Sequence, residues 1–145
     1  MFAKLFFVLC LSLAISFSSE SKADNAYNTA SQIAQPTAIT TSLVTADQTN
    51  VSWRGAVIFV NFSAYTSGSF TATIQAKDPI SGNYYNIGSS AAITATGLSI
   101  LKVYPGITST ANVAFSDLLP LTWRVNIVGT TSPIATVSVS AILMP

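Results

Sequence analysis

Beyond residue 23 the chain contains no cysteine, no histidine and no glutamate. Cys10 is the sole cysteine, so residues 24–145 form no disulfide among themselves and offer no thiol nucleophile. Without histidine there is no imidazole to serve as a general base near neutral pH or as a zinc ligand. The sequence therefore excludes Ser-His-Asp and Cys-His hydrolases, and it predicts a domain stabilised by its own core or by oligomerisation.

Charged side chains are also scarce in this sequence. Charged residues make up 8% of the chain, against roughly 25% in typical globular proteins. Between residues 24 and 145 the two signs cancel, with Arg54, Lys77, Lys102 and Arg124 against Asp24, Asp47, Asp78 and Asp117. Such a surface has no electrostatic footprint for nucleic acid or anionic lipid. We expect no nucleic-acid partner, and a neutral exterior suited to packing within an assembly.

The few acidic residues give no sign of an active site. The four aspartates are scattered along the chain, three of them beside turns, whereas a pair of catalytic carboxylates must converge within about 5–10 Å. A calcium site needs several oxygen ligands at loop spacing, and that pattern is missing from the sequence. Neither a Gly-x-Ser-x-Gly elbow nor a glycine-rich phosphate loop is present. The sequence predicts no catalytic residue, no metal ligand, no cofactor and no enzymatic activity.

Residues 1–23 have the pattern of an export signal. Lys4 precedes an apolar run over residues 5–17, and Ser21 and Ala23 place small residues where a signal peptidase reads. The run is shorter than the roughly 20 residues that cross a bilayer core. We therefore expect an extracellular chain that starts near Asp24 and has no membrane contact once the leader is removed. A buried or amphipathic helix, or a translation start placed too far upstream, are the alternatives.

The rest of the chain reads as successive β-strands. Residues 69–77 alternate cleanly between apolar and polar side chains, and residues 134–143 place Val137 and Val139 on one face. Residues 52–65 are apolar on both faces, which predicts a central strand covered on both sides. Turn signals recur every 8 to 15 residues, as in antiparallel sandwiches. We predict an all-β protein with a flexible arm at 24–36 and one antiparallel β-sandwich of about eight strands at 37–145, jelly-roll-like or immunoglobulin-like.

Aromatic side chains are the remaining candidates for ligand recognition, because sugar-binding sandwiches stack rings on exposed Trp and Tyr. Trp123 alternates with Val125 and Ile127, which favours a place in the core. Tyr84 and Tyr85 must point to opposite faces of their strand. The candidates for a carbohydrate platform, with core or interface packing as the competing interpretation, are Trp53, Trp123, Tyr65, Tyr84, Tyr85 and Tyr104.

Residues 54–144 resemble a family of small β-rich structural proteins encoded by tailed bacteriophages and prophages. The resemblance is carried by a serine-rich last strand and by the segments 54–60 (RGAVIFV), 73–82 (TIQAKDPISG), 93–97 (ITATG), 103–107 (VYPGI) and 118–125 (LLPLTWRV). It implies a structural role in a virion head, neck or tail, with other copies of the chain and other virion proteins as partners. It implies no catalytic residue.

The leader departs from this family, because phage structural proteins assemble in the cytoplasm and need no export signal. Two functions thus remain open from the sequence. The first is a virion structural subunit whose start is misplaced. The second is a secreted binding or surface module that recognises polysaccharide or another protein. The expected location is the virion or the extracellular space.

Overall fold

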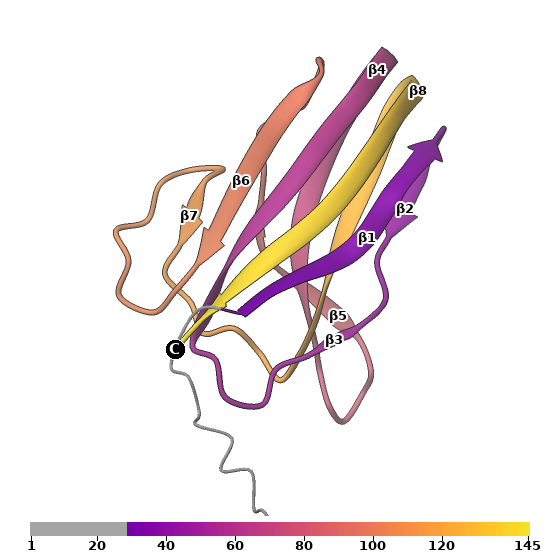
Figure 1. The fold of residues 1–145 in the computed structure, drawn as a ribbon. Helices are drawn as coiled ribbons and strands as arrows, with labels where there is room; N and C mark the ends of the chain where they lie inside the picture. The colour runs from indigo at the N-terminus through magenta and orange to yellow at the C-terminus, as the bar shows by residue number, and fades with distance from the viewer. Residues whose placement is uncertain (1–28) are drawn as a thin grey trace, which may run out of the picture.

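The computed structural model describes residues 29–145, so the predicted signal segment 1–23 and residues 24–28 of the predicted arm lie outside the described residues. The all-β prediction is confirmed, since residues 29–145 form one sheet and no helix. Figure 1 shows its strands: β1 (Thr29–Ile39), β2 (Ser42–Val44), β3 (Gln48–Thr49), β4 (Gly55–Lys77), β5 (Tyr84–Ser89), β6 (Gly97–Val103), β7 (Ala114–Phe115) and β8 (Thr122–Met144).

Two very long strands, β4 and β8, form the centre of the sheet. They pair antiparallel along their whole length, from Gly55 opposite Met144 to Ala76 opposite Trp123. Turn residues at 66–68 and at 129–133 predict a break in each of these strands. The structure keeps each as one strand that bends at these points, because the two strands carry their pairing through the bend with register shifts.

The bend divides the sheet into two halves that face each other (Figure 1). The first half-sheet has the order β1-β8-β4-β6-β7 and uses the start of β4 and the end of β8. The second half-sheet uses the other ends of β4 and β8, with β5 beside β4 and with β2 and β3 beside β8. Phe62 and Phe70 lie on either side of the bend with ring centroids 5.2 Å apart.

Special backbone angles make the bend possible. Gly68 has φ 88°, while Thr131 and Ser132 have φ 61° and 49°, so all three adopt the left-handed region. The hydroxyl of Ser67 donates to the carbonyl oxygen of Ser132 at 2.7 Å, and that of Tyr65 donates to the carbonyl oxygen of Gly68. The Ser67 bond joins β4 to β8 where the regular ladder is interrupted, and the Tyr65 bond braces the bend within β4.

One core lies between the two half-sheets. Alternate residues of β4 and β8 are buried, and they belong to a single cluster. Trp123 and Val139 are 2% and 1% exposed, which confirms the predicted inward face of both segments of β8. Burying a side chain of this size contributes roughly 1.5–3 kcal/mol. The largest fully buried side chains of the core are those of Trp123, Phe62, Phe70, Ile58, Ile74, Leu101 and Ile127.

Three predictions about local structure are wrong. Residues 29–36, predicted as flexible arm, belong to β1, where Ile33 and Ala34 pack against the core while polar neighbours face outward on an edge strand. The sheet is not wholly antiparallel, because β7 runs parallel to β6 after the loop at 104–113. The outer face of β4 at Val57 and Phe59 is half-buried rather than covered, since no second layer lies over it within residues 29–145.

Candidate interaction surfaces

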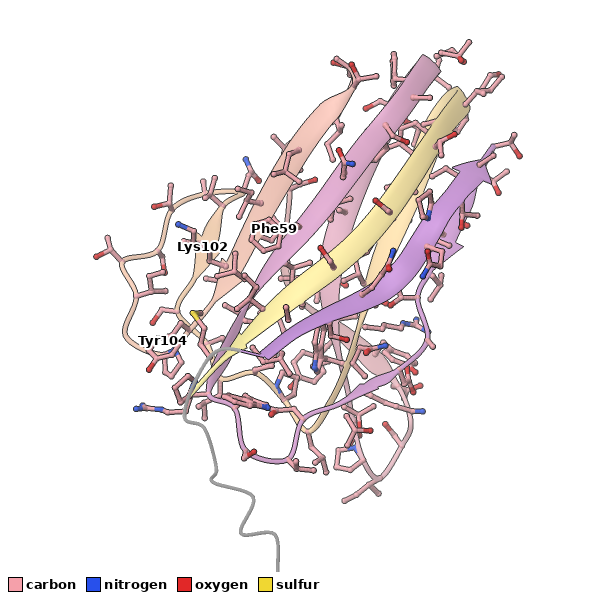
Figure 2. All side chains as sticks on the ribbon, viewed as in Figure 1. Phe59, Lys102 and Tyr104 are labelled. Atoms are coloured by element: carbon pink, nitrogen blue, oxygen red, sulfur yellow. The ribbon has the colours of Figure 1, made fainter. Side chains whose placement is uncertain are left out.

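Apolar side chains occupy part of the outer face of the first half-sheet, beside the polar side chains of Asn61, Ser138 and Ser140. Because strand residues alternate, Val57 and Phe59 point away from the core that Ile58 enters. Phe59 lies opposite Ile100 on β6 and Ser140 on β8. Figure 2 places Phe59 and Lys102 on this face. We call this surface the apolar face and define it by Val57, Phe59, Leu98, Ile100 and Ile142.

The apolar face is accessible rather than covered. Leu98 is 56% exposed, and Val57, Phe59, Ile100 and Ile142 are half-buried by one another. Lys102 stands opposite Val57 and brings the one charge among these outward residues of β4, β6 and β8. Contiguous exposed apolar side chains of this kind typically mark a contact site for another molecule.

A groove continues the apolar face at its lower end. It has a volume of about 410 Å³ and is lined mainly by Val57, Tyr104, Pro105, Ile107 and Met144. The hydroxyl of Tyr104 donates to the carbonyl oxygen of Pro145 at 2.9 Å, which ties this ring to the end of β8. The groove is therefore a preformed apolar notch that can accept an aliphatic or aromatic side chain of a partner.

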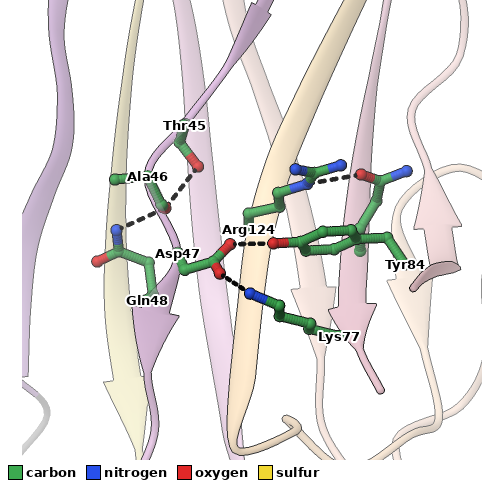
Figure 3. Close-up of polar contacts among 8 residues, drawn as sticks. Thr45, Ala46, Asp47, Gln48, Lys77, Tyr84 and Arg124 are labelled. Atoms are coloured by element: carbon green, nitrogen blue, oxygen red, sulfur yellow. Dashed lines mark hydrogen bonds and ion pairs between the residues drawn. The ribbon is translucent and has the colours of Figure 1, made fainter. Parts of the chain in front are cut away.

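A polar cluster lies on the outer face of the second half-sheet (Figure 3). Lys77 Nζ and Asp47 Oδ2 are 2.9 Å apart, and the Tyr84 hydroxyl donates to Asp47 Oδ1 at 2.6 Å. The Arg124 guanidinium stacks on the Tyr84 ring, 3.3 Å from its centroid, and its Nε donates to Gln75 Oε1 at 2.9 Å. We call this group, Asp47, Gln75, Lys77, Tyr84 and Arg124, the Asp47 cluster.

The electrostatics of the Asp47 cluster keep its charges fixed. The hydrogen bond from Lys77, followed by that from Tyr84, lowers the pKa of Asp47 below its ordinary value of 3.8. The hydrogen bond to Asp47 raises the pKa of Lys77 above 10.5. Both groups stay ionised at neutral pH and point at each other. The arrangement joins the residue that precedes β3 to β4, β5 and β8 across the sheet.

Asp78 and Asp117 perform the turn roles that the sequence predicts. Asp78 accepts hydrogen bonds from the backbone nitrogens of Ile80 and Ser81 at 3.0 and 3.3 Å, and from the hydroxyl of Ser81. The Ser81 hydroxyl is the main reason that the pKa of Asp78 is lowered. Asp117 accepts from the backbone nitrogen of Leu118 at 2.8 Å. Asp24 lies outside the described residues.

The candidate aromatic residues do not form one platform. Trp123 is buried, Tyr65 braces the bend, Tyr104 lines the groove, and Trp53 is half-buried beside Asn50, which binds its backbone. Tyr85 is 55% exposed, while Tyr84 points to the other face and enters the Asp47 cluster, as alternation requires. Arg124, which contacts the Tyr84 ring, and Gln75, which accepts a hydrogen bond from Arg124, are not predicted from the sequence. The alternation of these two polar residues with buried neighbours indicates that they face outward, but it does not reveal which strands pair.

No protein-family model and no curated protein matches the chain. Within residues 29–145, no three His, Cys, Asp or Glu side chains gather as a metal-ion site. In the same part of the chain, no helix has the length and apolar character needed to span a membrane.

Proposed function

We propose that the chain is a non-enzymatic structural subunit that repeats in an oligomer, as a component of a phage-like virion head, neck or tail. The observation that carries this proposal is the apolar face, with the groove at its lower end. Two segments of the family resemblance, 54–60 and 103–107, supply Val57, Phe59 and Tyr104 to this surface. A structural subunit needs such a face because its neighbours in the particle cover it.

The chemistry of the apolar face supports association with protein rather than with a charged ligand. Burial of its side chains contributes roughly 25 cal/mol for each Å² removed from water. Lys102 is the one charge among its outward residues, so little desolvation of charge opposes docking. A partner surface of similar composition, including that of another copy, satisfies these conditions.

The proposed architecture is a β-sandwich whose two layers are the half-sheets. The single core between them and the contact of Phe62 with Phe70 support this assignment. In this sandwich β4 and β8 pass from one layer to the other, so the layers cannot slide apart. A rigid body of this kind suits a subunit that repeats in a particle.

Peptide mass spectrometry of purified particles and of cell-free medium tests the proposed function. Peptides in the particles, in amounts comparable with known structural proteins, are the expected result. The N-terminal peptide shows at the same time whether residues 1–23 are present. Free protein that begins at Asp24 and never sediments with particles contradicts the virion role.

The alternative is a secreted module that binds polysaccharide or protein, and one observation favours it. Tyr85 is 55% exposed on β5, on the face opposite to Tyr84 and the Asp47 cluster. An exposed tyrosine ring offers an apolar surface with a polar hydroxyl at its tip, which suits stacking against a sugar ring. Retention on immobilised polysaccharide that is lost in Tyr85→Ala, while Tyr85→Phe is retained, supports this alternative. Equal retention of the three proteins argues against it.

A further inference from the structure

Most of β6 has a pairing partner on one side alone. Residues 97–103 pair with β4, but β7 reaches only Lys102 and Val103 on the opposite side. At about 3.3 Å per residue, the stretch 97–101 leaves roughly 13 Å of strand edge without a neighbouring strand in the described part of the chain. This stretch, which we call the β6 edge, lies at the side of the first half-sheet opposite to β1 (Figure 1).

The hydrogen bond made by the next residue, Lys102, shows which way the backbone groups of the β6 edge point. The backbone nitrogen of Lys102 donates to the carbonyl oxygen of Val113 at 2.8 Å, so Lys102 directs its amide away from β4. Backbone groups alternate along a strand, so Leu98 and Ile100 direct their N–H and C=O groups the same way. No strand pairs with them there within residues 29–145. The β6 edge thus offers donors and acceptors at the spacing that another strand requires.

Space for a strand exists beside the β6 edge. A groove of about 520 Å³ runs along residues 97–100, between the segment 91–96 and the turn at 111–113. Ile93 is held in place by reciprocal hydrogen bonds with Phe70, at 2.8 and 3.0 Å, so the far wall of the groove is fixed by the second half-sheet. Leu98 and Val113, 56% and 41% exposed, offer apolar contacts at its rim.

The β6 edge lacks the features that usually prevent edge-to-edge pairing. Natural edge strands are protected by charged side chains, proline or bulges. Residues 91–101 contain no charged residue and no proline, and the pairing of β6 with β4 has no bulge. β1 is free of charge as well, and its bulges and Pro36 fall after Gln32. Its first part, 29–32, is therefore as open to pairing as the β6 edge.

We propose that the β6 edge binds strand β1 of a second copy of this chain. β1 is one edge of the first half-sheet, and residues 97–101 of β6, which β7 does not reach, are the free part of the other edge. β1 runs antiparallel to β6 because each successive pair, β1–β8, β8–β4 and β4–β6, is antiparallel. Copies in the same orientation thus join in the antiparallel sense and continue the sheet from one subunit to the next. This inference rests on the proposed function, for which it names the interface and the partner.

The contact is heterologous, because each copy uses β6 toward one neighbour and β1 toward the other. Such contacts produce a closed ring when the rotation between copies closes, and a filament when it does not. The apolar face of each copy then continues onto that of its neighbour. The assembly therefore presents one extended surface to other components of a particle.

Sedimentation velocity of the purified full chain over a range of concentrations tests the proposal with a matched pair of variants. Ile100→Pro removes an outward N–H and leaves the hydrogen bonds to β4 in place, as proline on an edge strand permits. Ile100→Ala also loses the apolar side chain but keeps the N–H. We expect the wild type and Ile100→Ala to self-associate, and Ile100→Pro to weaken association by about tenfold or more.

A second variant keeps the test decisive if Ile100→Pro does not fold. Leu98→Lys preserves every backbone group and places a charge on the β6 edge, with Leu98→Gln as its neutral control. Loss of association in Leu98→Lys but not in Leu98→Gln supports the interface when the wild-type amides of Leu98 and Ile100 also become protected on association. A wild-type chain that is monomeric at all concentrations overturns the proposal, and so does association that survives in both Ile100→Pro and Leu98→Lys.

Hydrogen exchange distinguishes failure of this interface from failure of the proposed function. The amides of Leu98 and Ile100 should become protected as the wild-type chain associates. Association without that protection places the contact elsewhere, for instance on the apolar face, and leaves the virion role intact. Protection of these amides in a chain that never occurs in particles removes the virion role and keeps the interface.

Discussion

Trp123 lies in the core with 2% of its surface exposed, and within residues 29–145 no group accepts a hydrogen bond from its Nε1. A buried donor without a partner costs about 1–3 kcal/mol. Burial of the large ring offsets this cost, since aromatic side chains are among the greatest apolar contributors to a core. The indole nitrogen itself is therefore a liability, and the ring is the stabilising part.

Replacement of Trp123 separates these two contributions. Trp123→Ala should lower the free energy of unfolding by about 3–5 kcal/mol, because it removes the ring and leaves a cavity. Trp123→Phe should cost less than half as much, because it keeps one aromatic ring and removes the unsatisfied donor. Urea unfolding followed by circular dichroism measures both. Equal losses in the two variants would show that the indole nitrogen has a bonding partner in solution.

The ion pair of Asp47 and Lys77 predicts a specific pH dependence. The pKa of Asp47 is lowered from 3.8, so its contribution is present above that value and is lost as the pH falls through the lower folded pKa. The pKa of Lys77 is raised from 10.5, so its contribution is present below 10.5 and is lost as the pH rises through the higher folded pKa. The pair thus stabilises the fold between these two limits.

Thermal unfolding from pH 7 down to acid checks the carboxylate side. Asp47→Asn should lower the melting temperature at pH 7 slightly, because both partners are about one-third exposed and solvent screens them. The variant should lose less further stability toward acid pH than the wild type does. Asp78→Asn is the comparison, since the pKa of Asp78 is also lowered but by its own turn. An unchanged acid profile in Asp47→Asn contradicts the ion pair.

At the scale of elements, the bend of β4 and β8 depends on glycine at position 68. Its φ of 88° is unfavourable for any residue with a side chain, and a Cβ there would lie 2.4 Å from the Cα of Pro133. Gly82 has a similar φ of 73°, but a Cβ there would meet nothing within 4 Å. The two positions share the backbone strain and differ in the steric contact.

Gly68→Ala should therefore destabilise the chain more than Gly82→Ala does. We expect about 1–2 kcal/mol for Gly82→Ala from backbone strain alone, and several kcal/mol for Gly68→Ala because backbone atoms of β8 must also move. Chemical denaturation of both variants gives the comparison. Similar losses at the two positions would mean that the bend can open enough to admit a methyl group.

Alternation predicted most of the strands, since residues 69–77 and 134–143 bury the residues that their pattern selects. It did not reveal that β4 and β8 continue through their bends, because Gly68 and Pro133 have the same composition signals as ordinary turns. Residues 29–36 were missed because an edge strand with one exposed face has little apolar content.

The sequence predicts the candidate surfaces less well than it predicts the strands. Val57 and Phe59 gave a correct signal of apolar character, but a strand covered by its own chain and one covered by another molecule have the same pattern. The Asp47 cluster depends on the register of β3 with β8 and of β5 with β4. These pairings join residues distant in the sequence, and no local pattern specifies them.

At the scale of the molecule, the two half-sheets share one core and the same two central strands, so neither can unfold alone. Ile58 in the first half-sheet and Ile74 in the second are both fully buried. Replacement of either by alanine should cost about 2–5 kcal/mol and lower one common transition for the whole chain. Differential scanning calorimetry checks this. Two separate transitions in either variant would show that the half-sheets are independent.

The central place of β8 also has a consequence for synthesis. Its last residues, from Ile134 to Met144, lie between β1 and the start of β4 and pair with both. While the chain is still on the ribosome, β1 and β4 have already emerged but lack the strand that joins them. The first half-sheet therefore closes only after translation has passed Met144. Until then the nascent chain exposes apolar strands, and a chaperone that holds them would raise the yield of folded protein.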